Sequence, residues 1–94
     1  MEIPAKSPSL SGQLQISVKN ECVRIEGDQA GLSSFAAMVL WLGEVDQQRM
    51  TSLPVGERTH IHIHPGQLGD AATILFEGVA DVELCRADVK LKAI

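Results

Sequence analysis

Apolar residues occupy every second position in two neighbouring segments near the start of the chain. They are Leu14, Ile16 and Val18 in the first segment, and Val23 and Ile25 in the second. A period of two turns these side chains to one face of a strand, which can then be buried against a core. The pattern predicts strands over residues 13–18 and 21–26.

The two predicted strands are separated by Lys19 and Asn20. A tight turn at this pair would place Ile16 opposite Val23, and the apolar residues of both strands would then share one face. The sequence therefore predicts an antiparallel hairpin.

The next segment has the spacing of a helix. After Asp28, which can accept a backbone N–H as an N-cap, apolar and small residues recur at intervals of three and four: Leu32, Phe35, Ala36, Val39, Leu42 and Gly43. We predict a helix over residues 29–46 with this stripe against the sheet. At about 100° per residue, Trp41 falls on the opposite side, away from the sheet.

Two further segments alternate in the manner of strands. Residues 59–64 place Ile61 and Ile63 inward and the histidines outward. Residues 85–93 alternate an apolar inner face that begins with Cys85 and a charged outer face that begins with Arg86. Residues 70–84 fit either a helix, by apolar spacing, or a strand, by β-branched and aromatic content, and Gly78 disfavours the helix. We favour a strand over residues 72–78.

The element order is therefore ββαβββ, or ββαββ if residues 70–84 are helical. Either order predicts an α+β fold, a two-layer sandwich with one main helix packed on a mainly antiparallel sheet of four to five strands. We expect a single domain over residues 13–94. Residues 1–12, rich in proline and serine, predict a flexible N-terminal arm.

Composition narrows the class of partner. The 94 residues carry 8 Lys and Arg against 12 Asp and Glu, a net charge of −4, and the basic residues form no run. This disfavours nucleic acid as a partner, and the longest apolar stretch is too short to span a bilayer. Cys22 and Cys85 are too few and too far apart for a zinc knuckle or a redox pair. We expect a cytoplasmic protein with reduced thiols, no cofactor and no membrane partner.

All three histidines, His60, His62 and His64, lie on alternate positions. Neighbours on a strand are about 6.5–7 Å apart, so two of them could bind one ion, whereas the outer pair is about 13 Å apart by the same spacing. A metal site would need His62 with His60 or His64, and a third ligand such as Cys22 or Glu26. The favoured interpretation is that the histidines bind no metal and cover the solvent side of a sheet or contact a partner.

An apolar patch is predicted on the outer side of the helix. Trp41 would lie at its centre, near Ala37, Met38 and Val45. A large aromatic residue in an apolar patch is typical of an interface anchor. These residues and the three histidines are therefore the candidate partner-binding residues, for another protein or for a homodimer. The alternative is that residues 47–58 fold back and cover Trp41.

The chain shows no assembled catalytic constellation. A general base needs an orienting group and a substrate pocket, which a flat exposed strand does not supply. A nucleophilic pair of Cys22 with a histidine is conceivable, but a cysteine near the end of a hairpin is more often a packing residue. We therefore predict a protein with no enzymatic activity and no catalytic residues.

Residues 23–65 resemble the immunity protein 32 family of bacterial polymorphic toxin systems. In that family a strand leads into a helix with a Gly-Leu-x-x-Leu/Phe-Ala motif, and a later strand carries His-x-His. The matching residues here are Gly31, Leu32, Phe35, Ala36, His60 and His62. The similarity covers somewhat less than half of the chain and is looser over residues 66–94.

The resemblance implies a non-enzymatic immunity protein that neutralises a cognate bacterial toxin by direct binding, without a cofactor. It supplies no catalytic residues to transfer to this chain. Two alternatives stay open. One is a metal-binding protein that uses His60, His62 and His64, and the other is a small dimeric regulatory or accessory module.

Overall fold

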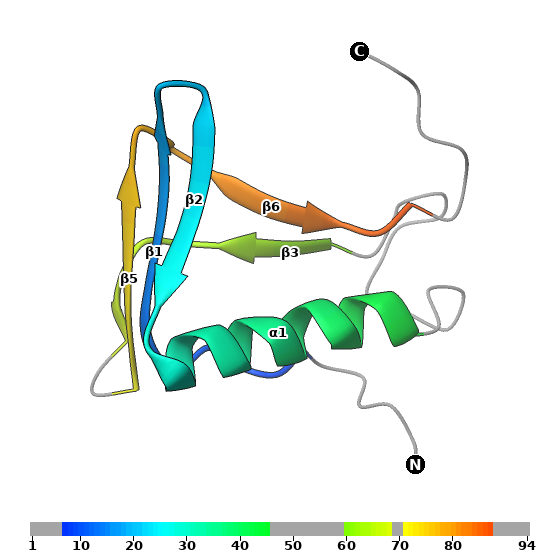
Figure 1. Ribbon diagram of the computed structural model, residues 1–94. Coiled ribbons are helices and arrows are strands. Elements are labelled where there is room, and N and C mark those ends of the chain that lie inside the picture. The colour runs from blue at the N-terminus through cyan, green and yellow to red at the C-terminus, as the bar shows by residue number, and fades with distance from the viewer. Residues whose placement is uncertain (1–6, 46–59, 69–70, 88–94) are drawn as a thin grey trace.

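The computed structural model describes residues 7–45, 60–68 and 71–87 (Figure 1). These residues form one helix, α1 (Gln29–Glu44), and six strands: β1 (Gly12–Lys19), β2 (Cys22–Gly27), β3 (His60–Ile63), β4 (Gly66–Leu68), β5 (Ala72–Glu77) and β6 (Val82–Cys85). The predicted α+β fold, with one main helix and mostly antiparallel strands, is confirmed.

The strands form two sheets. A four-stranded sheet has the order β2-β1-β5-β4, and β3 pairs with β6 in a separate two-stranded sheet. The β1–β2, β4–β5 and β3–β6 pairs are antiparallel, whereas β1 and β5 are parallel. The parallel pair and the division into two sheets were not expected, because residue alternation shows which face a strand buries but not which strand lies beside it.

The β1–β2 hairpin keeps the predicted face but not the predicted register. Ile16 lies opposite Ile25, two residues further along β2 than expected, and a shift by an even number leaves every side chain on its own face. The turn consists of Asn20 and Glu21, with φ angles of 52° and 63°, instead of Lys19 and Asn20. A two-residue hairpin turn with both φ angles positive is helped by asparagine, which adopts this conformation more readily than most residues.

The start of α1 is tied to the start of β1 through one carboxylate. Asp28, the predicted N-cap, accepts the backbone N–H of Gly31 at 2.7 Å and that of Gln13 at 3.0 Å. The N–H of Gln13, and then that of Gly31, holds the pKa of the Asp28 carboxyl below its ordinary value of 3.8. Gly31 permits the approach, because a Cβ at this position would collide with the carbonyl oxygen of Gln13.

The core lies on one face of the four-stranded sheet. In Figure 1, α1 and the β3–β6 pair extend from the same side of this sheet. The main buried cluster contains Leu10, Leu14, Ile16, Met38, Ile63, Ala72 and Ile74, and a second cluster at the C-terminal end of α1 contains Trp41, Leu42 and Val45. Ile61 and Leu84 pack against both clusters, so the smaller sheet connects the two parts of the core.

The face that α1 buries differs from the predicted one. Its buried residues are Gly31, Met38, Trp41 and Leu42. Trp41 is only 7% exposed, while Leu32 and Val39 are each 44% exposed. The expectation that Trp41 lies on the side of the helix away from the sheet is therefore wrong, because Ile61 of β3 and Leu84 of β6 pack against the cluster that contains it. The physical reason is that α1 is apolar on more than one side and the β3–β6 pair packs near its C-terminal half, a contact that the helical period does not reveal.

The C-terminal strands confirm one expectation and correct another. β5 bears out the strand predicted over residues 72–78, and its burial alternates as a strand requires. β6 spans Val82–Cys85, so this strand begins earlier than the predicted 85–93. Val82 and Leu84 are half-buried and Cys85 is exposed. The prediction that Cys85 lies on the inner face is therefore wrong. Residues 88–94 lie outside the described residues. β4, directly after Pro65, was not expected.

Arg86 closes the C-terminal end of α1. Its Nη1 donates to the carbonyl oxygen of Leu42 at 3.4 Å and to that of Val45. A guanidinium there satisfies carbonyl groups that lack a partner within the helix and interacts favourably with the helix dipole. The residue was expected on a charged outer strand face, and its contact with α1 arises from the tertiary structure.

The packed structure also includes part of the expected N-terminal arm. Leu10 is 8% exposed and belongs to the core. The Ser34 hydroxyl donates to the carbonyl oxygen of Ser11 at 3.1 Å and accepts its N–H at 3.0 Å. Packing therefore begins before Gln13, the expected start of the domain, while residues 1–6 and the expected loop 47–58 lie outside the described residues.

Candidate functional site

The histidine strand is arranged as the alternation predicts. Ile63 is 3% exposed and Ile61 is half-buried, while His62 and His64 are exposed and His60 is intermediate. The rings of His60 and His62 lie 5.0 Å apart at 86°, and those of His62 and His64 lie 6.1 Å apart at 16°. The three rings therefore follow one another along one side of the chain, although His64 lies just beyond the end of β3.

β6 supplies the groups that lie beside these histidines. His62 is opposite Glu83 and His60 is opposite Cys85. Nδ1 of His62 lies 3.8 Å from Oε2 of Glu83, with both side chains about half exposed at 51% and 48%. An exposed pair of this kind contributes at most about 1 kcal/mol, and only while the imidazole is protonated.

The β1–β2 hairpin does not supply the third metal ligand, Cys22 or Glu26, that the sequence suggested for a histidine site. Cys22 and Glu26 lie on β2, in the four-stranded sheet, whereas His60 and His62 belong to the separate β3–β6 sheet and His64 directly follows β3. Across residues 7–45, 60–68 and 71–87, no group of three or more His, Cys, Asp or Glu side chains is placed to hold a metal ion.

A cavity of about 310 Å³ lies beside the histidine strand. Leu10, Met38 and Ile61 form part of its apolar wall, and His62 and His64 lie at it as well. A largely apolar cavity with a few polar groups is a general property of binding sites. We call His60, His62 and His64 the histidine stripe. The cavity beside it has room for an apolar side chain of a partner.

The helix residues predicted to bind a partner are mostly inside the protein. Trp41, Met38 and Val45 are 7%, 7% and 5% exposed, and Ala37 alone of the four is exposed. Trp41 belongs to a core cluster with Leu42 and Val45. The structure therefore offers Ala37 and the histidines to a partner, but not the predicted patch around Trp41.

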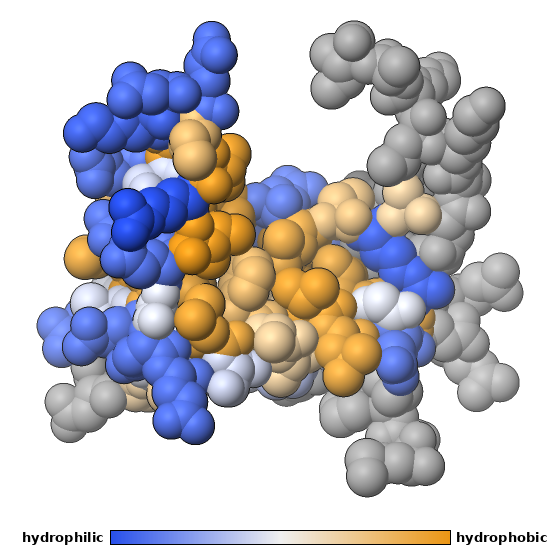
Figure 2. Space-filling model, viewed as in Figure 1, coloured by the Kyte–Doolittle hydropathy of each residue, from blue (hydrophilic) through white to orange (hydrophobic). Residues whose placement is uncertain are grey.

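A different apolar surface is exposed, which we call the open apolar face. It consists of Val18, Val23, Ile25, Leu32, Val39 and Leu40, each 38–66% exposed. Figure 2 shows hydrophobic residues gathered on the side of the molecule where β2 and α1 lie in front. The sequence signal for this face was an excess of apolar residues around α1, because a helix that is apolar on several sides needs more than one sheet to cover it.

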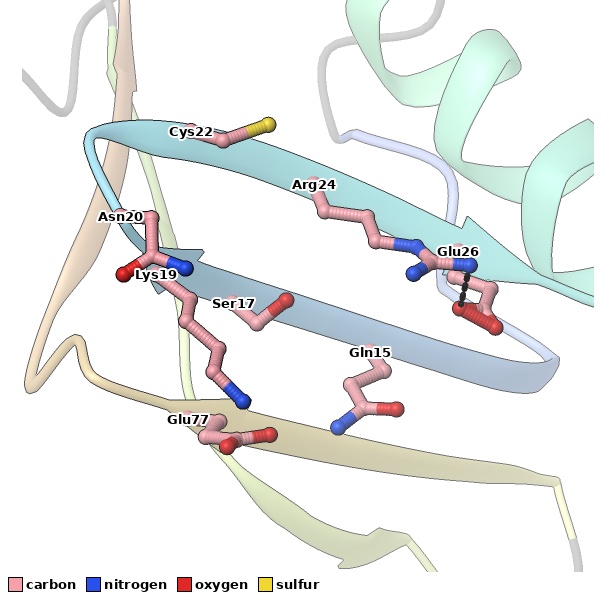
Figure 3. Close-up of a pocket in the computed structure, with 8 residues that line it drawn as sticks. All are labelled: Gln15, Ser17, Lys19, Asn20, Cys22, Arg24, Glu26 and Glu77. Atoms are coloured by element: carbon pink, nitrogen blue, oxygen red, sulfur yellow. Dashed lines mark ion pairs between the residues drawn. The ribbon is translucent and has the colours of Figure 1, made fainter.

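The opposite face of the four-stranded sheet is mostly polar, with Leu75 as an exposed apolar residue. Figure 3 shows side chains of β1, β2 and β5 around a depression of about 420 Å³. Arg24 and Glu26 form an ion pair of 3.1 Å there, with 71% and 55% of their side chains exposed. Lys19 extends toward Glu77 in the same view. A polar, exposed depression lacks the apolar enclosure typical of small-molecule sites.

Two further findings concern the chain rather than this site. None of the described segments contains a helix long and apolar enough to cross a membrane. Comparison of the chain with protein-family models, with curated proteins and with solved structures found no match.

Proposed function

We propose that this chain is a non-enzymatic binding protein that holds a partner protein against the open apolar face. The observation that carries the proposal is the high exposure of Val23 on β2 and of Leu40 on α1, 66% and 62%, together with the hydrophobic surface that Figure 2 shows over these two elements. Large apolar patches on a small domain mark protein interfaces more often than they are neutral. Complete burial of one such side chain stabilises a complex by about 1.5–3 kcal/mol.

The specific form of this function is that of a bacterial immunity protein, which neutralises a cognate toxin in the cytoplasm by binding it. This form rests on the resemblance carried by Gly31, Leu32, Phe35, Ala36, His60 and His62. Leu32 belongs to the open apolar face, and His62 lies at the cavity beside Leu10 and Met38. The toxin would then contact apolar residues of α1, with the histidine stripe as a second contact.

Two leucines with similar exposure provide the test. Leu40 is 62% exposed on the open apolar face, and Leu75 is 54% exposed on the opposite face of the sheet. The binding partner for this test is to be sought as a toxin-like protein encoded immediately upstream of the gene for this chain. We expect Leu40→Glu to weaken binding roughly tenfold or more, because a charge is buried in the interface, and to abolish protection of cells that express the toxin.

Leu75→Glu is the matched control and should leave both affinity and protection unchanged. Calorimetry measures the affinity, and circular dichroism checks that both variants fold. An equal effect of the two substitutions, or the absence of any complex with the toxin, would contradict the proposal.

A further inference from the structure

β2 has one edge that no described strand covers. It stands at the end of the four-stranded sheet, with β1 as its neighbour on one side. Lys19 and Cys22 close the two-residue turn, and a closing pair of this kind is hydrogen-bonded. Alternation then directs the backbone groups of Val23, Ile25 and Gly27 to the outer edge. Such an edge is a template for pairing with another strand.

The apolar side chains next to this edge are exposed. Val23 and Ile25 are 66% and 45% exposed although they lie on the same sheet face as the buried Ile16. Leu32 of α1 lies beside the end of β2, since its Cγ is 3.5 Å from the position of a Cβ built on Gly27. The outer edge of β2 therefore presents backbone donors and acceptors together with exposed apolar side chains.

We propose that a second copy of this chain occupies the β2 side of the open apolar face, paired antiparallel along β2 with Ile25 opposite Ile25 of the second copy. The inference rests on the proposed function, because it divides the open apolar face: the second copy covers the β2 side, and the toxin contacts the apolar residues of α1. The two copies are related by a two-fold axis perpendicular to the sheet, which is the usual symmetry of a homodimer. Their four-stranded sheets become continuous across the axis.

Charge selects this register. In an antiparallel pair, residues whose backbone groups point to the outer edge must lie opposite residues of the same kind in the second copy. If most of β2 is paired, this leaves two positions for the two-fold axis, one through Ile25 and one through Arg24. An axis through Arg24 sets two guanidinium groups opposite each other, which is destabilising. An axis through Ile25 sets Arg24 opposite Glu26 of the second copy and Glu26 opposite Arg24 of the second copy. It also pairs Val23 with Gly27 of the second copy, which adds hydrogen bonds that the other register lacks.

The same rotation brings apolar groups together. Because the axis is perpendicular to the sheet, the faces that carry Val23 and Ile25 in each copy remain on one side of the joined sheet. Ile25 then contacts Ile25 of the second copy, and cross-strand pairs of β-branched residues stabilise a sheet. The exposed ion pair of Arg24 and Glu26, at 3.1 Å in one copy, becomes part of a network of four charges.

A charge exchange tests the register. Sedimentation equilibrium of the full chain at low salt should show a dimer, and Arg24→Glu should raise its dissociation constant roughly tenfold, because like charges then face each other in two places. The double variant Arg24→Glu with Glu26→Arg should return the constant to within about threefold of the original. Circular dichroism checks folding, and high salt should reduce all these differences.

A second variant tests the edge itself. Ile25→Pro removes an N–H that points away from β1, so the hairpin is expected to persist while the dimer is lost. A chain that stays monomeric at concentrations on the order of 0.1 mM overturns the inference, and so does a dimer that the charge exchange does not restore. The toxin-binding comparison of Leu40→Glu with Leu75→Glu is independent of both outcomes, so failure of the dimer and failure of the proposed function can be told apart.

Discussion

Two glycines of α1 have different structural roles. Gly31 lies in the first turn, where the helix approaches β1, and a Cβ there would collide with the carbonyl oxygen of Gln13. Gly43 lies near the other end, where a Cβ would meet no atom of the described residues within 4 Å. The sequence alone makes both positions look like weak points of a helix, because glycine is a poor helix former in either place.

Alanine substitutions should therefore act in opposite directions at these positions. We expect Gly31→Ala to lower the free energy of unfolding by about 1–3 kcal/mol through overpacking, despite the better helix propensity of alanine. Gly43→Ala should raise it by about 0.5–1 kcal/mol. Urea denaturation measures both values. Stabilisation by both substitutions would show that the contact between α1 and β1 is not as close as described.

At the scale of elements, α1 begins where the sequence predicts because its cap is local. Asp28 and the first turn of the helix are neighbours in the chain, so a capping residue is visible without tertiary information. The second contact of the carboxylate, with the N–H of Gln13, joins two elements and is not visible in this way. Together these contacts make the Asp28 carboxylate a pH-dependent link between α1 and β1.

The stability difference between the natural chain and Asp28→Asn should depend on pH. Asparagine keeps an acceptor oxygen but not the charge. The pKa of Asp28 is lowered in the folded state, so its contribution is fully present above the unfolded value of about 3.8 and disappears as pH falls through the folded pKa. We expect the natural chain to be more stable at pH 7 and the difference to shrink below about pH 4.

Denaturation of both proteins at a series of pH values measures this difference directly. Other carboxyl groups titrate in both proteins, and their effect cancels in the comparison. A difference that stays constant from pH 7 to pH 3 would contradict a lowered pKa.

At the scale of the whole molecule, the two sheets determine which side of α1 is inside. Trp41 and Leu40 are adjacent in the chain, yet Trp41 is 7% exposed and Leu40 is 62% exposed. Ile61 of β3 and Leu84 of β6 pack against the cluster that contains Trp41. Burial at this end of α1 thus depends on strands that follow the helix in the chain.

Substitution of these adjacent residues should separate a core role from a surface role. Trp41→Ala is expected to cost about 3–5 kcal/mol of unfolding free energy, a large share of the stability of a small domain. Leu40→Ala should change it by no more than about 0.5 kcal/mol. Thermal and chemical denaturation check both values, and a small effect of Trp41→Ala with the fold intact would restore Trp41 as a surface residue.

The sequence by itself determined the local features: the helix with its Asp28 cap, most of the strands, and the outward histidines beside inward Ile61 and Ile63. These depend on periodicity and on neighbours in the chain, which the order of residues contains. The tertiary structure alone decided the parallel pairing of β1 with β5, the burial of Trp41, the contact of Arg86 with α1 and the open apolar face. Each of these depends on contacts between segments far apart in the chain, and a residue period indicates a buried side but not the element that buries it.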